Sequence, residues 1–173
     1  MAEPEVDEVE ARVRADIATH GWHLALVPPE DDTPGWALTI GLFERFDHPE
    51  IVVFGPDIEA VARLAHHVAS LVRDGRRFEA GCDAGDVLVD QRLGFRGVAP
   101  KWVAPFLGNA AWHYRSEGFP VLQCVWPDPG GHLPWEPGAD PAWRDDQPLL
   151  HHQETHRALP ERLVAVLRRE GAL

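Results

Sequence analysis

The sequence has few of the residues that nucleophilic and redox chemistry require. Its 173 residues include two cysteines, Cys82 and Cys124, and two serines, Ser70 and Ser116. Two cysteines this far apart do not make a disulfide framework and are typical of small buried apolar side chains. The chain has no Gly-x-Ser-x-Gly and no Gly-Lys-Ser/Thr. The usual signatures of serine hydrolases and phosphate-binding loops are therefore missing.

Long apolar runs are also missing. No stretch approaches the ~20 residues that a helix needs to span a bilayer. The chain begins with acidic residues at positions 3, 5, 7 and 8, whereas a signal peptide begins with basic ones. We therefore expect a cytoplasmic protein without a membrane partner.

Basic residues are in the minority. The chain has 16 Lys and Arg against 28 Asp and Glu, a formal net charge of −12. Such a surface repels phosphate backbones, so nucleic acid is an unsuitable partner. Hydrophobic residues make up 45% of the chain, and a domain of this length buries roughly 70% of its unfolded surface. We expect one domain over residues 1–173.

Three segments show helical periodicity. Residues 5–19 carry apolar side chains at three- and four-residue spacing. Asp57 is a good N-cap for an apolar-faced helix that ends at Gly75. Residues 159–170 resemble a closing helix, and residues 100–115 resemble a broken one.

Strand patterns lie between these helices. Alternating or fully apolar runs predict strands at 22–27, 36–42, 50–54, 77–80, 87–90 and 119–125. Strands and helices do not alternate regularly, which argues against a doubly wound parallel sheet. The pattern predicts an α+β domain with a mainly antiparallel sheet and helices packed on one face.

A long segment after the last strand is rich in proline and tryptophan. Residues 127–148 contain six prolines, and Trp126, Trp135 and Trp143 lie in or beside them. Disordered segments lack aromatic residues, so we expect an ordered loop. We expect it to fold over the sheet near the turn around His48.

Several of these segments carry a family resemblance. The run from Gly35 to Gly55 contains Thr39-Ile40-Gly41-Leu42 and His48-Pro49-Glu50. It resembles an uncharacterised bacterial family, domain-of-unknown-function family 4262. Val121-Leu122-Gln123, Trp126-Pro127-Asp128, Pro134-Trp135-Glu136 and Gln147-Pro148 resemble the same family. The resemblance covers roughly residues 20–150 and implies a small soluble bacterial protein. It brings no activity and no catalytic residues.

His48 is the first candidate for chemistry. It lies in a turn between two core strands, and Pro49 favours extended geometry in the residue before it. A histidine placed there can act as acid or base near neutral pH, or as a single metal ligand. A turn histidine that bonds local backbone is the alternative interpretation.

A histidine cluster near the C-terminus is the second candidate. In a helix, His152 and His156 would share a face at the i, i+4 spacing of metal ligands, with zinc or iron as the ion. A third ligand is not apparent from the sequence. A polar linker before the last helix is the alternative interpretation.

A ligand pocket is the third candidate. We expect it to be lined by Trp36, Thr39, His48, Gln123, Trp126, Asp128 and Trp135. Aromatic walls with one acidic group suit flat or cationic ligands. The alternatives are that Gln123 bonds a neighbouring backbone and that Trp135 plugs the proline-rich loop.

Three kinds of function remain open. The first is a small-molecule or peptide-binding accessory protein that uses this pocket. The second is a metal-assisted, hydrolase-like enzyme that uses His48 and the histidines of residues 151–156. The third is an interaction module, such as an immunity or regulatory protein, with a protein partner or a second copy of the chain. A flavin-binding split barrel is the structural alternative.

Overall fold

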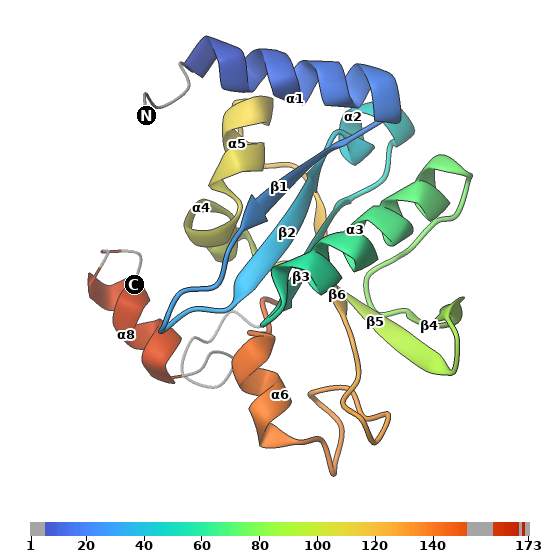
Figure 1. The fold of residues 1–173 in the computed structure, drawn as a ribbon, viewed down its shortest axis with the longest axis vertical. Coiled ribbons are helices and arrows are strands. Elements are labelled where there is room, and N and C mark those ends of the chain that lie inside the picture. The colour runs from blue at the N-terminus through green and yellow to red at the C-terminus, as the bar shows by residue number, and fades with distance from the viewer. Residues whose placement is uncertain (1–5, 152–160, 170, 172–173) are drawn as a thin grey trace.

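One mixed sheet organises the protein. The computed structural model describes residues 6–151, 161–169 and 171. The six strands have the order β1-β2-β3-β6-β5-β4 (Figure 1). They are β1 (His23–Val27), β2 (Gly35–Ile40), β3 (Glu50–Gly55), β4 (Asp83–Leu88), β5 (Gln91–Gly97) and β6 (Val121–Val125). Only the β3–β6 pairing is parallel among these strands. The predicted α+β class and the mainly antiparallel sheet are confirmed.

Helices cover both faces of this sheet. They are α1 (Val6–His20), α2 (Leu42–Phe46), α3 (Ile58–Arg73), α4 (Val103–Phe106), α5 (Gly108–Tyr114), α6 (Pro141–Asp146) and α8 (Glu161–Arg169), with the 3-10 helix η1 at Pro100–Trp102. On one face, α3 packs Val61, Ala65 and Val68 into a cluster with Ile51 and Val53 of β3. Asp57 caps this helix as predicted, because its side chain accepts hydrogen bonds from the backbone N–H groups of Glu59 and Ala60.

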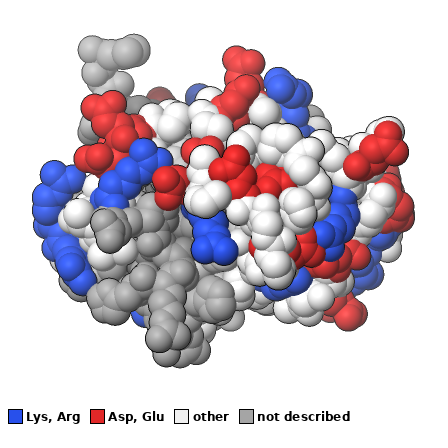
Figure 2. All heavy atoms as spheres, turned by 90° about the horizontal axis from the view of Figure 1, so that it is seen from below, with Lys and Arg blue, Asp and Glu red and all other residues white. Residues whose placement is uncertain are grey.

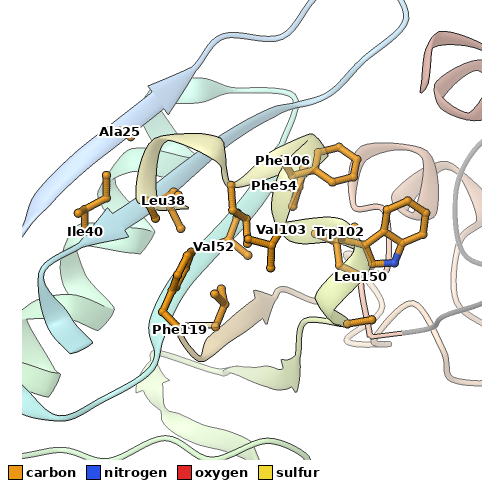
Figure 3. Packing of buried hydrophobic residues seen from close by; sticks show 14 of the residues in the cluster. Ala25, Leu38, Ile40, Val52, Phe54, Trp102, Val103, Phe106, Phe119 and Leu150 are labelled. Atoms are coloured by element: carbon orange, nitrogen blue, oxygen red, sulfur yellow. The ribbon is translucent and has the colours of Figure 1, made fainter. Parts of the chain in front are cut away.

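The opposite face is covered by η1, α4, α5 and α8, with α1 crossing its end. Val52 and Phe54 of β3 point to this side and pack against Trp102, Val103 and Phe106 (Figure 3). The expectation that helices lie on one face was therefore wrong. Every residue of β3 is buried, and a strand buried on both sides needs cover on both sides.

The β4–β5 hairpin differs from the predicted strands at 77–80 and 87–90. Its turn lies at Val89–Asp90, and Asp90 adopts a φ of 57°. Asp tolerates this left-handed conformation better than most residues, so the turn forms without a glycine at this position. The predicted broken helix over 100–115 corresponds to η1, α4 and α5.

The long proline-rich loop is ordered and contains α6. Two glutamines hold its ends. The Gln123 side chain donates to the Pro148 carbonyl (2.7 Å) and accepts from the Leu150 N–H (2.9 Å). The Gln147 side chain accepts from the Trp126 N–H (3.0 Å) and donates to the Trp126 carbonyl (2.9 Å). We call Gln123 and Gln147, with their four hydrogen bonds, the glutamine clasp. Each side-chain amide takes the place of a neighbouring strand, because it gives hydrogen-bond partners to backbone N–H and C=O groups that buried chain segments must satisfy.

The loop lies over β5 and not near His48, which corrects the predicted position. The Trp135 ring covers Gly94, where an added Cβ would lie 2.6 Å from the ring. Arg96 stacks on the other part of the indole with its guanidinium carbon 4.1 Å from the ring centroid. A glycine and a cation on one strand face therefore dock the loop.

The surface mixes charges of both signs. Acidic and basic side chains lie interspersed on the face shown in Figure 2. None of the described helices combines the length and the hydropathy needed to cross a bilayer.

The glutamine clasp predicts a specific loss of stability. Replacing Gln123 with Leu keeps the side-chain volume but leaves the Pro148 carbonyl and the Leu150 N–H buried without partners. Each of the two orphaned groups costs about 1–3 kcal/mol, so we expect the free energy of unfolding to fall by about 2–6 kcal/mol in urea titrations. Gln91→Leu, at the exposed end of β5, is the matched control and should change stability by less than about 0.5 kcal/mol. Equal losses in the two variants would contradict a structural role for the clasp.

Candidate functional site

The predicted pocket residues do not meet in one place. In the parallel pair, Glu50 lies opposite Val121 and Val52 lies opposite Gln123. His48 therefore precedes the start of both strands, and Trp126 follows their end. At about 3.3 Å a residue, the span from Glu50 to Gly55, which is level with Trp126, is already roughly 16 Å along the strands. The structure does not bring His48 and Trp126 into a shared pocket, because the parallel pairing puts them at opposite sheet ends.

His48 is almost completely buried, with 1% of its surface exposed. Its Nε2 accepts a hydrogen bond from the Phe78 N–H (3.0 Å), so Nδ1 carries the proton and donates to the Pro49 carbonyl (2.7 Å). Burial is the main reason that the pKa of His48 is lowered, and the nearby Arg77 charge adds to this effect. Both ring nitrogens are occupied by backbone groups. This geometry supports the interpretation of a turn histidine that bonds backbone.

A pocket lies beside His48 at the starts of β3 and β6, with a volume of about 570 Å³. We call it the strand-start pocket. Its walls include Phe78, Val98, Val103, Phe119, Val121 and Leu122, and its rim includes Arg77, Glu79 and Glu117. His48 joins two of its sides, because the ring bonds Pro49 on one side and Phe78 on the other. The histidine thus shapes this pocket without offering a free nitrogen to it.

The most heavily bonded polar group nearby is Glu50, which sequence reasoning did not select. Its carboxylate is buried and receives hydrogen bonds from five donors. The Thr39 hydroxyl donates at 2.6 Å, the Gly41 N–H at 2.8 Å and the Tyr114 hydroxyl at short range. The other two donors are the N–H groups of Leu42 and Phe43. The carboxylate therefore caps the first turn of α2, where helix N–H groups lack partners.

Local backbone geometry makes this cap possible. Gly41 has a φ of 123°, and an added Cβ would lie 2.9 Å from the Gly21 carbonyl oxygen. Only glycine fits there. At the other end of α2, the Arg77 guanidinium donates to the carbonyls of Phe46 (2.7 Å) and Asp47 (2.5 Å). A buried anion and a cation thus hold the two ends of this short helix.

Burial raises the pKa of the Glu50 carboxyl, and the hydrogen bonds from Thr39, Tyr114, Gly41 and Phe43 oppose this rise. The same environment raises the pKa of Tyr114, through burial and then through the Glu50 charge. A signal for Glu50 was available in the sequence. A glutamate that begins a fully apolar strand must have buried partners, because an unpaired charge there is prohibitive.

Three other predicted residues hold structure together. Trp36 donates from Nε1 to the Phe106 carbonyl (2.9 Å), and Thr39 also accepts from the Ile51 N–H (2.8 Å). Asp128 accepts from the N–H groups of His132 and Asp140, both at 2.9 Å, and so closes the loop after β6. These bonds give each side chain a structural partner.

Trp126 borders a second hollow, of about 500 Å³, between α3 and the β4–β5 hairpin. We call it the α3–hairpin groove. Its apolar walls are Val53, Val61, Leu64, Leu88 and Trp126, and its rim holds Asp57, Ala60, Arg63, His67 and Gln91. The indole is fixed, because Nε1 donates to the Phe54 carbonyl (2.8 Å) while the clasp holds the backbone. Trp135 docks on Gly94, on the sheet face opposite to Leu93 and Phe95, which pack with α3, so it does not reach this groove.

No metal centre is formed by the described residues. Within residues 6–151, 161–169 and 171, no three His, Cys, Asp or Glu side chains are placed to hold an ion. His152 and His156 lie outside the described residues, so the zinc or iron prediction stays a prediction.

Comparison with known proteins identifies the family. The sequence model of the family described as "Domain of unknown function (DUF4262)" matches residues 16–140. This match covers well over half of the chain, and the chain belongs to that family. The predicted resemblance is confirmed. No curated protein and no solved structure matches the chain.

The bonding of His48 predicts its behaviour in titration. Its pKa is lowered from the ordinary value of 6.5. The folded state therefore holds the neutral ring, and its contribution to stability is present above about pH 6.5 and lost as the pH falls through the folded value. We expect ¹⁵N NMR to show a proton on Nδ1 and a bare Nε2 in the neutral ring, and a ring transition at lower pH than that of an ordinary histidine. A proton on Nε2, or a ring transition at higher pH than that of an ordinary histidine, would rule out the bonding described here.

Replacing Glu50 with Gln tests the buried cap. The amide NH₂ would face N–H donors, so we expect the free energy of unfolding to fall by about 2–3 kcal/mol. Because the folded pKa of Glu50 is raised, its contribution to stability is full below about pH 4.5 and declines as the pH rises through the folded value. The stability gap between wild type and variant should therefore narrow from pH 5 to pH 8. The exposed Glu59→Gln is the control, and a gap that widens with pH would refute the raised pKa.

Proposed function

We propose that this member of the DUF4262 family is a binding protein for a small, largely apolar molecule, which it takes into the α3–hairpin groove. The observation that carries the proposal is the groove itself, whose apolar walls end at a tryptophan that is fixed before any ligand arrives. Its volume of about 500 Å³ is within the usual range of ligand pockets.

The position of the groove supports this proposal. β3 and β6 form the parallel pair, and their carboxyl ends lie at Gly55 and Val125. The groove opens beside these ends, between Pro56 at the start of the α3 connection and Trp126 after β6. In sheets with parallel strands, ligands bind outside the carboxyl ends of the strands. At this edge β3 runs directly into α3, as strands run into helices in such sheets.

The chemistry of the walls indicates the kind of ligand. Leu64 of α3 and Leu88 of the hairpin both line the groove, and both are partly exposed. An apolar ligand body that covers them removes their surface from water, at roughly 25 cal/mol for each Å² buried. Arg63 and Gln91 lie on the rim, where they can pair with a polar end of the ligand. Rigid apolar walls with few polar groups are typical of small-molecule sites.

A filled groove tests the proposal. Ala60 is exposed on the rim, and Ala60→Trp places an indole in the groove without disturbing the buried face of α3. The probe is 8-anilinonaphthalene-1-sulfonate, whose fluorescence increases in apolar sites. We expect one saturable site in the wild-type protein and at least about 10-fold weaker binding in Ala60→Trp, because the probe and the indole compete for the same space.

Glu59→Trp is the matched control. It adds the same indole to the neighbouring position of α3, where the side chain faces solvent and does not line the groove. Probe affinity should stay within about 2-fold of wild type. Equal binding by the wild type and by Ala60→Trp would show that the groove is not the site.

A further inference from the structure

We propose that the strand-start pocket is a second binding site, and that it takes a ligand with a cationic amine on an apolar body. This site is independent of the α3–hairpin groove, because the two hollows lie at opposite ends of the parallel pair. Its volume of about 570 Å³ is ample for an aromatic amine or a short amphiphile.

The interior of the pocket is apolar. Phe78, Val103 and Phe119 come from three different segments and converge on it, and Pro100 and Pro120 complete the walls. Pro49 and Pro120 lack a backbone N–H, so the walls offer few donors to an anionic ligand. The Phe119 ring can attract a cation or an aromatic group. The Phe78 ring adds apolar wall area, because it is already stacked on Phe95 with Arg76 over it.

The rim supplies unpaired negative charge. Glu79 and Glu117 both border the pocket and both are exposed. Among the described residues, neither carboxylate has an ion-pair or hydrogen-bond partner, in contrast to Asp83, Asp86 and Glu136, which pair with arginines. Two free carboxylates beside an apolar hollow complement an ammonium group.

The positive groups of the pocket are already engaged. Arg77 lies on the rim and donates to the carbonyls of Phe46 and Asp47 at the end of α2, so its guanidinium is already hydrogen-bonded within the protein. His48 lines the pocket with both nitrogens bonded to backbone. The rim therefore carries two carboxylates and one hydrogen-bonded guanidinium group. This charge balance favours a positively charged ligand.

Three probes of one shape test this selection. They are 2-phenylethylamine, phenylacetate and 2-phenylethanol, which differ in the charge of the same small aromatic body. Binding is followed by chemical-shift changes of the Phe78, Val98 and Val121 amides in ¹H–¹⁵N spectra. We expect the amine to bind at least about 5-fold more tightly than the other two, and its preference to weaken as salt rises.

Charge-neutral variants identify the cause. In Glu79→Gln/Glu117→Gln the amine should lose its preference and bind like the alcohol, while Glu59→Gln on α3 should keep the wild-type preference. Ala80→Trp, which fills the pocket from its exposed rim, should abolish the shifts at these three amides for every probe. Tighter binding of phenylacetate, an amine preference that survives the double variant, or no shifts with any probe would each overturn the proposal. None of these outcomes bears on the α3–hairpin groove, which does not share these residues.

Discussion

The Glu50 carboxylate is the interaction on which much of this architecture depends. Removing a charged group from water costs several kcal/mol unless its partners are in place. Here the partners come from β2, from the first turn of α2 and from Tyr114 of α5, so one side chain joins three elements. The carbonyl of Phe46, at the end of α2, accepts a hydrogen bond from Arg77. The residue after Arg77 is Phe78, whose backbone N–H donates to His48. The borders of the strand-start pocket follow from this chain of contacts.

Much of the fold was predictable because periodicity and capping are local properties. The apolar stripe of α3, its Asp57 cap and the alternation of β2 are all visible in the sequence and all present in the structure. The parallel β3–β6 pairing is not local, since it joins segments that are separated by two other strands, three α-helices and the 3-10 helix η1. The sequence does not reveal this pairing, and without it the positions of His48 and Trp126 at opposite ends of the parallel strand pair could not be predicted.

The candidate site was less predictable than the fold, because its geometry also depends on contacts between segments far apart in the sequence. Trp126 and Trp135 are nine positions apart, but they pack on opposite sheet faces. Polar residues that looked like ligand contacts, Gln123 and Asp128, satisfy backbone groups whose positions depend on the folded loop. The alternatives in which Gln123 bonds a neighbouring backbone and Trp135 anchors its loop are the ones that the structure supports. Glu50 was not among the predicted site residues. Its buried carboxylate resembles a catalytic group, but all five of its hydrogen-bond donors belong to the protein and hold the fold together.

The central place of β3 also has a consequence for how the chain is made. β3 lies between β2, which precedes it, and β6, which begins about seventy residues after it starts. On the ribosome, this strand, which is apolar after Glu50, therefore emerges with one hydrogen-bonding edge unmatched until β6 has been synthesised. Unmatched apolar edges invite pairing with other nascent chains. The finished fold removes this hazard, because β6 occupies the open edge and β3 is buried along its whole length.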